Sequence, residues 1–437
     1  MSEALLVGVL AIGALLAVGA LGVPVAFSMI SVGVVGLWYV GGFGFMASTL
    51  KTLPYQVLSE YAFAVIPMFI LMGALASVAG LTSELYAVTN RLFGRVRGGL
   101  LMATTLASAI FGAISGSTIV NATVFTRIAL PEMLKFGYER GISAGCIAAS
   151  GTFAALIPPS ISLVIVAILT EASIGSLLIA GIVPGIFTAV VYLIGIAVIV
   201  RIRPHLAPRQ GQHYTLAEQL RGLLEIGPAL ALIGIVLGGI YTGLLFPSSA
   251  GAIGATGALA IALLRRRLDW ANLWTALQRT ATATAALFFI VIGGLVFSRL
   301  LTYGGFITGL SQLVAGWDLT PVQFIIAICV LYLILGMFID TMSIMLITIP
   351  FLWPVAKHIG VDVVWFAIIV VKMIEIATIT PPVGLNLFAV MSASDNTVKA
   401  GELIRGVMPF IIMELCVLAV LVAVPEISTW LPAQMGN

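Results

Sequence analysis

The sequence predicts an all-α polytopic membrane protein. Of its 437 residues, 61% are hydrophobic and 8% are charged, whereas soluble domains carry about 25% charged residues. Apolar runs near the ~20 residues needed to cross a bilayer recur from Ala4 to Val422. These runs are continuous and rich in Leu, Ile, Ala and Gly, which favours helices over the alternating strands of a membrane barrel. A water-soluble globular fold is excluded.

About eleven or twelve of these runs are expected to span the bilayer, while the others are too short or too broken to cross. Glu3 precedes the first run without a basic segment, so that run is expected to be a retained span and not a cleaved signal. The runs begin near Ala4, Val25, Ala62, Leu101, Gly141, Ile161, Ser176, Ile226, Ala250, Ala285, Val322, Phe366, Leu387 and Val407.

Basic residues predict how these spans are oriented. They concentrate in three loops, around Arg95, Arg209 and Arg266, and an excess of Lys and Arg marks cytoplasmic loops. The turn at Phe246 is then periplasmic. The formal net charge is only +3, and its placement in short loops indicates membrane orientation and not nucleic-acid binding.

Three further segments flank the spans. Residues 82–97 and 269–280 look amphipathic and are expected to lie along the membrane interface; ordinary loop helices are the alternative. Residues 201–222 form the most polar segment and are expected to link two halves of the chain in the cytoplasm.

Glycines and prolines recur at matching intervals in the two halves, as in transporters built from repeats. The intervals agree to within two residues, and the marks are Gly112, Pro131, Pro158 and Pro184 in the first half and Gly336, Pro354, Pro381 and Pro409 in the second. One basic loop follows the run at Ala62, whereas another precedes the equivalent run at Ala285. The equivalent runs should therefore cross in opposite directions, as an inverted repeat whose binding sites lie near the midplane.

A polar tip interrupts apolar sequence in the first half. It reads SGSTIVN, residues 115–121, where Ser117 and Asn121 share one helix face and Gly116 lets the backbone turn. These side chains could bind an ion. The alternative is that they hydrogen-bond between helices, as such residues often do in membrane bundles.

Double prolines follow each tip region, at Pro158–Pro159 and Pro381–Pro382. Each pair removes two amide donors, which frees upstream carbonyl groups at membrane depth. Carbonyl and hydroxyl oxygens are ligands for hard cations, so a sodium ion could bind here; the alternative is that the prolines only bend packed helices. The side chains available are Ser115, Ser117, Asn121, Thr152, Thr380 and Asn386.

Ionisable residues inside apolar runs are functional candidates by default. Asp340 follows GMFI without a charged neighbour, while Lys372 and Glu375 are three residues apart and could simply neutralise each other. Glu414, in the final apolar run, receives no assigned role.

Arg127 lies six residues after Asn121. Its guanidinium could meet an anionic substrate, pair with Glu132 or extend to water at the membrane surface. Pairing and extension are together the more common outcomes.

Enzyme signatures are missing from the sequence. No GxxxxGK[ST] phosphate loop is present, so the chain is not expected to hydrolyse ATP. His205, His213 and His358 lie in polar loops without metal-ligand spacing. A membrane-embedded transferase, which would need clustered carboxylates or histidines, is therefore a remote alternative.

The motifs GAISGSTIVNAT, IALPEM, LIPPSI, AGIVPG, GGIYTGLLFP, GMFID and ITPPVGLNLF, together with GY at Gly137, resemble the large membrane subunit of tripartite ATP-independent periplasmic (TRAP) transporters, the DctM-like family. The resemblance runs essentially end to end. It implies an inverted-repeat, elevator-type secondary transporter in the bacterial inner membrane, with broken helices and two re-entrant hairpins tipped near residues 115–121 and 340–348. It also implies sodium (Na+) as the coupling ion, a small four-helix membrane subunit, and a periplasmic substrate-binding protein that delivers a small organic acid.

On this basis the chain divides into N-terminal scaffold spans at 1–60, a first repeat at 61–200, the cytoplasmic linker at 201–222, further scaffold spans at 223–267 and a second repeat at 268–437. Each repeat would hold an arm, a hairpin and a broken helix. The expected sodium-binding residues are Ser115, Gly116, Ser117, Asn121, Thr152, Pro158, Asp340, Thr380, Pro381 and Gly384. The expected substrate contacts are Ser160, Arg127 and Asn386.

The chain departs from the family pattern at three places. Ser248, Ser249 and Ala250 stand where Thr-Glu-Ala is usual, Arg127 replaces a small residue, and Ala377 replaces a frequent glycine. A stand-alone divalent-anion sodium symporter of related architecture is the alternative function. The sequence does not identify the acid carried.

Overall fold

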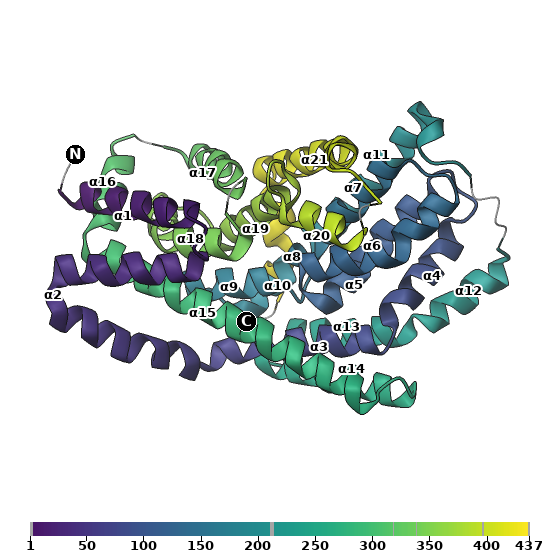
Figure 1. Ribbon diagram of the computed structural model, residues 1–437, viewed down its shortest axis with the longest axis horizontal. Coiled ribbons are helices and arrows are strands. Elements are labelled where there is room, and N and C mark those ends of the chain that lie inside the picture. The colour runs from purple at the N-terminus through teal and green to yellow at the C-terminus, as the bar shows by residue number, and fades with distance from the viewer. Residues whose placement is uncertain (1–2, 210–213, 318, 338, 396, 436–437) are drawn as a thin grey trace.

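The computed structural model describes residues 3–209, 214–317, 319–337, 339–395 and 397–435. Every regular element in these ranges is a helix, so the predicted all-α fold is confirmed. Figure 1 shows an elongated molecule with α1 and α2 at one end of the long axis and α4 and α12 at the other.

The first half runs from the N-terminus to the short helix η2. Its helices are α1 (Glu3–Ala20), α2 (Val25–Ser59), η1 (Tyr61–Ala64), α3 (Val65–Val78), α4 (Leu81–Phe93), α5 (Gly99–Ser115), α6 (Thr118–Lys135), α7 (Arg140–Gly151), α8 (Phe153–Leu156), α9 (Ile161–Thr170), α10 (Ile174–Ala180), α11 (Ile182–Ile202) and η2 (Pro204–Leu206).

The second half repeats this order after one linker helix. Its helices are α12 (Leu216–Glu225), α13 (Gly227–Tyr241), α14 (Pro247–Leu264), α15 (Trp270–Tyr303), α16 (Phe306–Ala315), α17 (Pro321–Gly336), α18 (Thr341–His358), α19 (Val363–Ile379), α20 (Leu385–Ala393), α21 (Ala400–Ala423) and α22 (Glu426–Ala433).

The predicted internal repeat is confirmed by the residues that start equivalent helices. Ser117 caps α6 and Asp340 caps α18, a separation of 340 − 117 = 223. Glu139 and Asp362, which cap α7 and α19, have the same separation, 362 − 139 = 223. Each capping side chain accepts a backbone N–H in the first turn of its helix, which satisfies a donor that the helix itself leaves free. The two halves therefore share one order of elements.

Long helices of each half pack against the other half. The helix α2 runs beside α15, and α14 lies along α3 (Figure 1). Small residues allow the close approach, since a Cβ at Gly33 would lie 2.8 Å from Val296 and a Cβ at Gly251 would lie 3.0 Å from Met68. These four helices form a frame beside the hairpins and broken helices.

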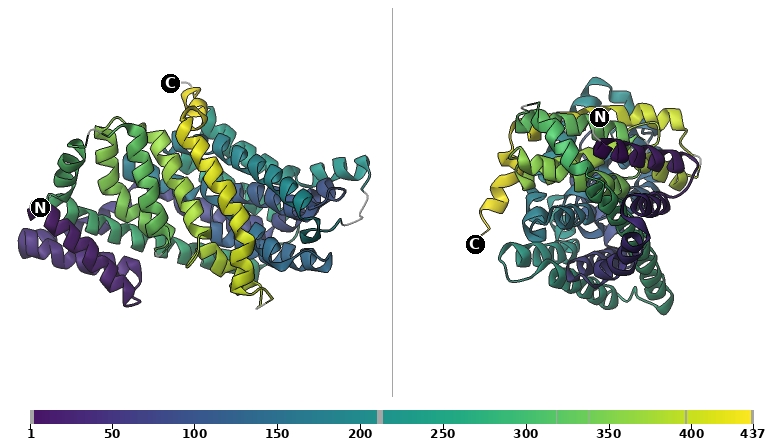
Figure 2. Two further views of the ribbon diagram at one scale, coloured as in Figure 1. Left: turned by 90° about the horizontal axis from the view of Figure 1, so that it is seen from above. Right: turned by 90° about the vertical axis from the view of Figure 1, so that its left-hand side faces the viewer.

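The long helix α21, which precedes the last helix, lies at the boundary between the two repeats. Figure 2 shows it, in yellow, between green helices of the second half and blue and teal helices of the first. It packs on α7 with little separation, because a Cβ at Gly406 would overlap the backbone oxygen of Gly141. The hairpin and broken-helix units of both repeats therefore form one packed body.

Fewer of the described helices than expected reach the full length of a span. Seven described helices are long and apolar enough to cross a membrane, or nine if each of two bent pairs counts once; eleven or twelve were expected. The apolar runs at Ala4, Leu101 and Val322 form shorter apolar helices, of 10–17 residues each. Two of them, α5 and α17, end at hairpin tips, which is why an apolar run does not always mean a crossing.

The second amphipathic segment is also corrected. Residues 269–280 do not form a separate helix, because α15 continues from Trp270 to Tyr303 over 34 residues. The first segment does form its own amphipathic helix, α4. Amphipathic periodicity identifies the exposed face in both cases but does not show where a helix stops.

The polar linker is more ordered than a simple connection. Residues 210–213, which include His213, lie outside the described residues, but α12 follows with a capping box formed by Thr215 and Glu218. Arg91 of α4 pairs with Glu225 at 3.1 Å. The expected end of the linker, at residue 222, falls inside α12. The expected end of the first repeat, at residue 200, falls inside α11.

The three basic loops meet around α4. Arg95 donates to the backbone oxygen of Tyr214 at 2.7 Å, and Arg265 pairs with Glu84. Arg267 lies 3.8 Å from the same glutamate. The three loops therefore share one end of the molecule, as expected of loops on one side of the membrane.

Candidate functional site

The first hairpin turns at a glycine. The helix α5 ends at Ser115, and Gly116 has a φ of 60°, a left-handed conformation that side chains rarely adopt. Ser117 then caps α6 by accepting the backbone N–H of Val120 at 3.5 Å. A Cβ at Gly116 would lie 3.2 Å from the carbonyl oxygen of Pro159. The tip therefore rests on the double-proline break of the same repeat.

The second hairpin has an acidic cap in the equivalent place. Asp340 accepts the backbone N–H of Ser343 at 3.0 Å and also the Ser343 hydroxyl. Phe338, within the GMFID motif, lies outside the described residues.

Both hairpins are seated on broken helices through equivalent contacts. A Cβ at Gly112 would lie 3.0 Å from the backbone nitrogen of Ala154, and a Cβ at Gly336 would overlap the Ala377 side chain. The breaks of the two repeats also meet, because Asn386 donates to the carbonyl oxygen of Ala148 at 3.1 Å. Segments more than 200 residues apart in sequence thus lie together.

A cavity of about 510 Å³ lies where these segments converge. Its walls include the first tip at 115–120, the second tip at 340–342, and residues of both broken helices. Helices α3 of the first repeat and α15 of the second, called the arm helices below, line the remaining side, so both repeats contribute to the lining. Most of the lining is apolar, and Arg279 of α15 and Asp340 are the charged residues among its described lining.

Four of the expected sodium-binding residues line this cavity: Ser115, Gly116, Ser117 and Asp340. The hydroxyl of Ser115 is buried and has no hydrogen-bond partner among the described residues. An oxygen of this kind, next to the carbonyl groups of a helix end, fits a hard cation that prefers oxygen ligands. The first tip therefore has oxygen atoms of the kind that bind sodium.

Asn121 has different contacts. Its Oδ1 accepts the Ser108 hydroxyl at 3.1 Å and its Nδ2 donates to the Ser108 backbone oxygen at 3.0 Å. The side chain is fully buried and joins α5 to α6, the two helices of the first hairpin. This is the interhelical role that the sequence left open.

Hydroxyls at the breaks bond to their own helices. Thr152 donates to Ala149 at 2.8 Å and Thr380 donates to Ile376 at 2.6 Å. Ser160 caps α9 and donates to the backbone oxygen of Ala155. These oxygens keep lone pairs for a further contact, but the residues do not line the cavity, nor do Pro158, Pro381 and Gly384.

The expected substrate contacts are spread over different surroundings. Arg127 is exposed on α6 outside the cavity lining and forms no ion pair within the described part of the chain. Asn386 is fully buried, and its Oδ1 has no partner among the described residues. Of the three, Asn386 thus keeps an unused acceptor at the break.

Sequence reasoning missed Arg279. It lies in the segment interpreted as an interfacial helix, where a basic residue is expected to face lipid headgroups. Only the packing of α15 against the hairpins places it in the cavity wall. The charge itself was the available signal.

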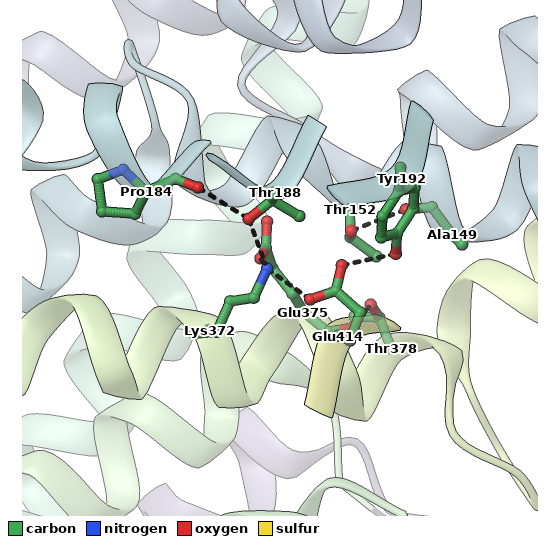
Figure 3. Close-up of polar contacts among 9 residues, drawn as sticks. All are labelled: Ala149, Thr152, Pro184, Thr188, Tyr192, Lys372, Glu375, Thr378 and Glu414. Atoms are coloured by element: carbon green, nitrogen blue, oxygen red, sulfur yellow. Dashed lines mark hydrogen bonds and ion pairs between the residues drawn. The ribbon is translucent and has the colours of Figure 1, made fainter. Parts of the chain in front are cut away.

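Sequence reasoning also missed a buried cluster of charges. Lys372 and Glu375, for which mutual neutralisation was one of the alternatives, are in contact, with Nζ and Oε2 2.7 Å apart. Glu414 of α21 joins them, and Tyr192 donates to Glu414 at 2.6 Å (Figure 3). No sequence spacing connects residues on α11, α19 and α21, so this cluster follows from tertiary packing alone.

Comparison with known proteins identifies the family. A family model described as tripartite ATP-independent periplasmic transporter, DctM component, matches residues 12–427. The C4-dicarboxylate TRAP transporter large permease protein DctM of Pseudomonas aeruginosa is 33% identical over 384 residues, covering 87% of this chain and 88% of that protein. The 2,3-diketo-L-gulonate TRAP transporter large permease protein YiaN of Escherichia coli is 31% identical and covers 95% and 96%. The sialic acid TRAP transporter large permease protein SiaM of Vibrio cholerae is 29% identical and covers 94% and 95%.

The fold is also similar to a solved transporter. The Alcanivorax borkumensis YdaH transporter superimposes with a TM-score of 0.63 at 15% identity, covering 89% of each chain. At this identity the likeness concerns the fold alone. The matched relatives are transporter permease subunits and not enzymes. The chain therefore belongs to the DctM family, the large membrane subunits of tripartite ATP-independent periplasmic transporters, and is a multi-pass protein of the bacterial inner membrane.

Proposed function

We propose that this chain is the carrier that moves a small organic acid across the inner membrane, driven by sodium. The observation that carries the proposal is the cavity walled by both hairpin tips, both broken helices and both arms. Sites at such a repeat interface are where repeat-built transporters bind substrate and coupling ion. C4-dicarboxylate, sialic acid and 2,3-diketo-L-gulonate, in the names of the relatives, are all acids.

Arg279 is the residue that suits an acidic substrate. A guanidinium presents donors in a planar fork that matches both oxygens of a carboxylate. Arg279 is an exposed residue at the edge of this lining, where an incoming acid could reach it. Asp340, at the tip of the second hairpin, would repel a second carboxylate of the substrate. The substrate would then bind in one preferred orientation.

Sodium binding is assigned to the tips. Ser115 offers its free hydroxyl, Gly116 and Pro159 offer nearby backbone carbonyls, and Asp340 offers a carboxylate at the second tip. A bound cation would supply positive charge beside the substrate's carboxylate. The tips themselves keep water away from that pair and hold the ligand oxygens in place.

We assign the transport step to an elevator movement. The hairpins, the broken helices and the helices α10, α11 and α21 would form the moving body. The helices α1, α2, α13 and α14 would stay fixed, and the arm helices α3 and α15 would stay with them. The cavity supports this division, because one wall belongs to the body and the opposite wall belongs to arms α3 and α15. Substrate bound at the tips would move past those arms with the body.

Two partners complete the proposed function: a small membrane subunit and a periplasmic substrate-binding protein. The family description is tripartite, and a relative in Oleidesulfovibrio alaskensis is an isethionate permease named DctMQ, of which this chain covers 64%. An apolar groove of about 420 Å³ between α1 and α2 would suit the small subunit.

Reconstitution tests the proposed function. Proteoliposomes holding this chain, its small subunit and the binding protein should accumulate a C4-dicarboxylate or a related acid only with an inward sodium gradient. Uptake without the binding protein would favour the stand-alone divalent-anion sodium symporter instead. ATP-driven uptake would contradict both functions.

The substitution Arg279→Gln tests the assigned carboxylate contact. It should raise the KM for the acid by about tenfold or more, because a charge-assisted hydrogen bond contributes roughly 1.5–3 kcal/mol. Arg279→Lys should be intermediate, since a lysine keeps the charge but not the fork. An unchanged KM in Arg279→Gln would remove Arg279 from the substrate site.

A further inference from the structure

Three charged side chains lie in the apolar interior outside the cavity lining. Lys372 and Glu375 are on α19 and Glu414 is on α21, and all three side chains are 0% exposed. Thr188 and Tyr192 of α11 complete the cluster, as Figure 3 shows. Because α11 belongs to the first repeat and α19 and α21 to the second, the cluster joins the two repeats.

The contacts of Lys372 are those of a charged ammonium group. Its Nζ donates to Thr188 Oγ1 at 3.1 Å and to Glu375 Oε2 at 2.7 Å, and it forms an ion pair with Glu414. An ammonium group has three N–H donors, so each donor has one acceptor. A neutral amine would leave one of these oxygens without a donor. Lys372 therefore contributes one positive charge.

The two glutamates have unequal surroundings. Glu414 accepts the Tyr192 hydroxyl through Oε1 at 2.6 Å and pairs with Lys372 through Oε2. Glu375 accepts from Lys372 through Oε2, while its Oε1 is buried with neither a hydrogen bond nor an ion pair in the described ranges; Glu414 Oε2 also lacks a hydrogen bond but keeps its ion pair with Lys372. Donors stabilise an ionised carboxylate, so Glu414 is the better site for the negative charge.

The charge count requires one more positive charge or one proton. Two ionised glutamates against one lysine leave a net charge of −1 in an apolar interior, and a buried group in that position takes up a proton instead. The other titratable side chains in the middle of the described helices packed around the cluster are thiols and a phenol, which supply no positive charge: Cys146, Cys329, Tyr332 and Cys416. The basic side chains on the described helices packed around the cluster lie near helix ends: Arg140, Arg201, Lys357, His358 and Arg405.

We propose that Glu375 is a proton-binding site whose Oε1 holds one proton at neutral pH. The cluster is then neutral, with one ammonium, one carboxylate and one carboxylic acid. The proton is retained and not carried with the substrate, because the cluster's side chains are buried and none lines the cavity between the tips. The contacts of the neutral cluster connect α11 of the first repeat to α19 and α21 of the second.

Infrared spectroscopy of the purified full chain in lipid nanodiscs tests this directly, independently of any transport activity. At neutral pH the wild type should show the carbonyl band of a protonated carboxylic acid, and Glu375→Gln should lose it. Glu426→Gln, which changes an exposed glutamate on α22, should keep the band. Absence of the band from the wild type, or its survival in Glu375→Gln, would overturn the proposal.

Thermal unfolding decides which glutamate holds the proton. The amide of Glu375→Gln replaces a neutral acid of the same shape, so the melting temperature should match the wild type. Glu414→Gln should melt at a lower temperature, because it removes the charged partner of Lys372. The reverse order would place the proton on Glu414, and equal losses would mean that both glutamates are ionised. No change in either variant would contradict the role of the cluster in joining the repeats.

Discussion

Ser115 is the residue at the first tip whose oxygen is free to bind an ion. Ser115→Ala should raise the sodium concentration needed for half-maximal uptake by about tenfold, because one ligand to a cation is lost. Expression and melting temperature should stay unchanged, since the hydroxyl bonds to no described residue. Sodium titration of uptake in proteoliposomes measures the effect, with the exposed Ser59→Ala as the control. Identical sodium dependence in both variants would remove Ser115 from the ion site.

Asn121 is expected to behave differently from Ser115. Asn121→Ala removes both contacts to Ser108, whose hydroxyl keeps the Ser150 backbone oxygen at 2.9 Å, so the protein should lose about 1–3 kcal/mol of stability through the lost bond from Nδ2 and the lost packing. Unfolding of the purified chain by heat or denaturant measures this loss. A stable Asn121→Ala variant with weakened sodium dependence would instead return Asn121 to the set of ion ligands.

At this scale the sequence predicted what backbone geometry requires. Gly116 was found because a turn between two membrane helices needs a glycine, and Ser117 because a polar residue interrupts an apolar run; the structure shows that Ser117 and Asp340 occupy equivalent caps. Arg279 was not found, because its place in the cavity lining depends on which helices pack beside α15. Glu414 was left without a role for the same reason, since its partners lie on other helices.

Among the helices, the contact between α7 and α21 depends most on the absence of a side chain. Gly406→Ala would drive a methyl group into the backbone of Gly141, so it should destabilise the protein by about 1–3 kcal/mol or more. Gly401→Ala, on the same helix with nothing within 4 Å of the added Cβ, should be neutral or gain about 0.5–1 kcal/mol from helix propensity. Melting temperatures of the two variants provide the measurement. Equal melting temperatures would contradict the close packing.

Helix order was more predictable than helix length. Glycines and prolines mark tips and breaks in both halves, and these marks identified the repeat before any packing was known. The extent of α15 was missed, because an apolar span following an amphipathic stretch gives no signal of whether the axis continues. The start of α12 within the polar linker was missed, although Thr215 and Glu218 form a capping box, a pattern that the sequence itself shows.

For the molecule as a whole, composition fixed the class and left the number of crossings uncertain. A hydrophobic run can be buried either in lipid or inside the protein, and the sequence does not distinguish the two. Hairpin helices that stop at a tip, such as α5 and α17, therefore look like spans. The same ambiguity explains why the charged cluster at Lys372 resembled a functional site: burial inside protein and exposure to a transport pathway produce the same sequence pattern.

The central claim is that the hairpin tips move as one body past the arm helices, carrying substrate in the cavity between them. Paired cysteines test this directly in a background where Cys146, Cys329 and Cys416 have been replaced. Ser77 on α3 and Val120 at the first tip both line the cavity, on opposite sides of the proposed division, whereas Val120 and Ser162 both lie within the moving body.

Sodium-driven uptake should be measured before and after a bifunctional thiol reagent links each pair. Linking Ser77→Cys to Val120→Cys should abolish uptake, while either single cysteine should retain it. The linked Val120→Cys with Ser162→Cys pair narrows the same cavity without joining the tip to α3, so it should retain more uptake than the first pair. If uptake continues with the tip fastened to the arm, the tip does not move past α3, and the account is contradicted.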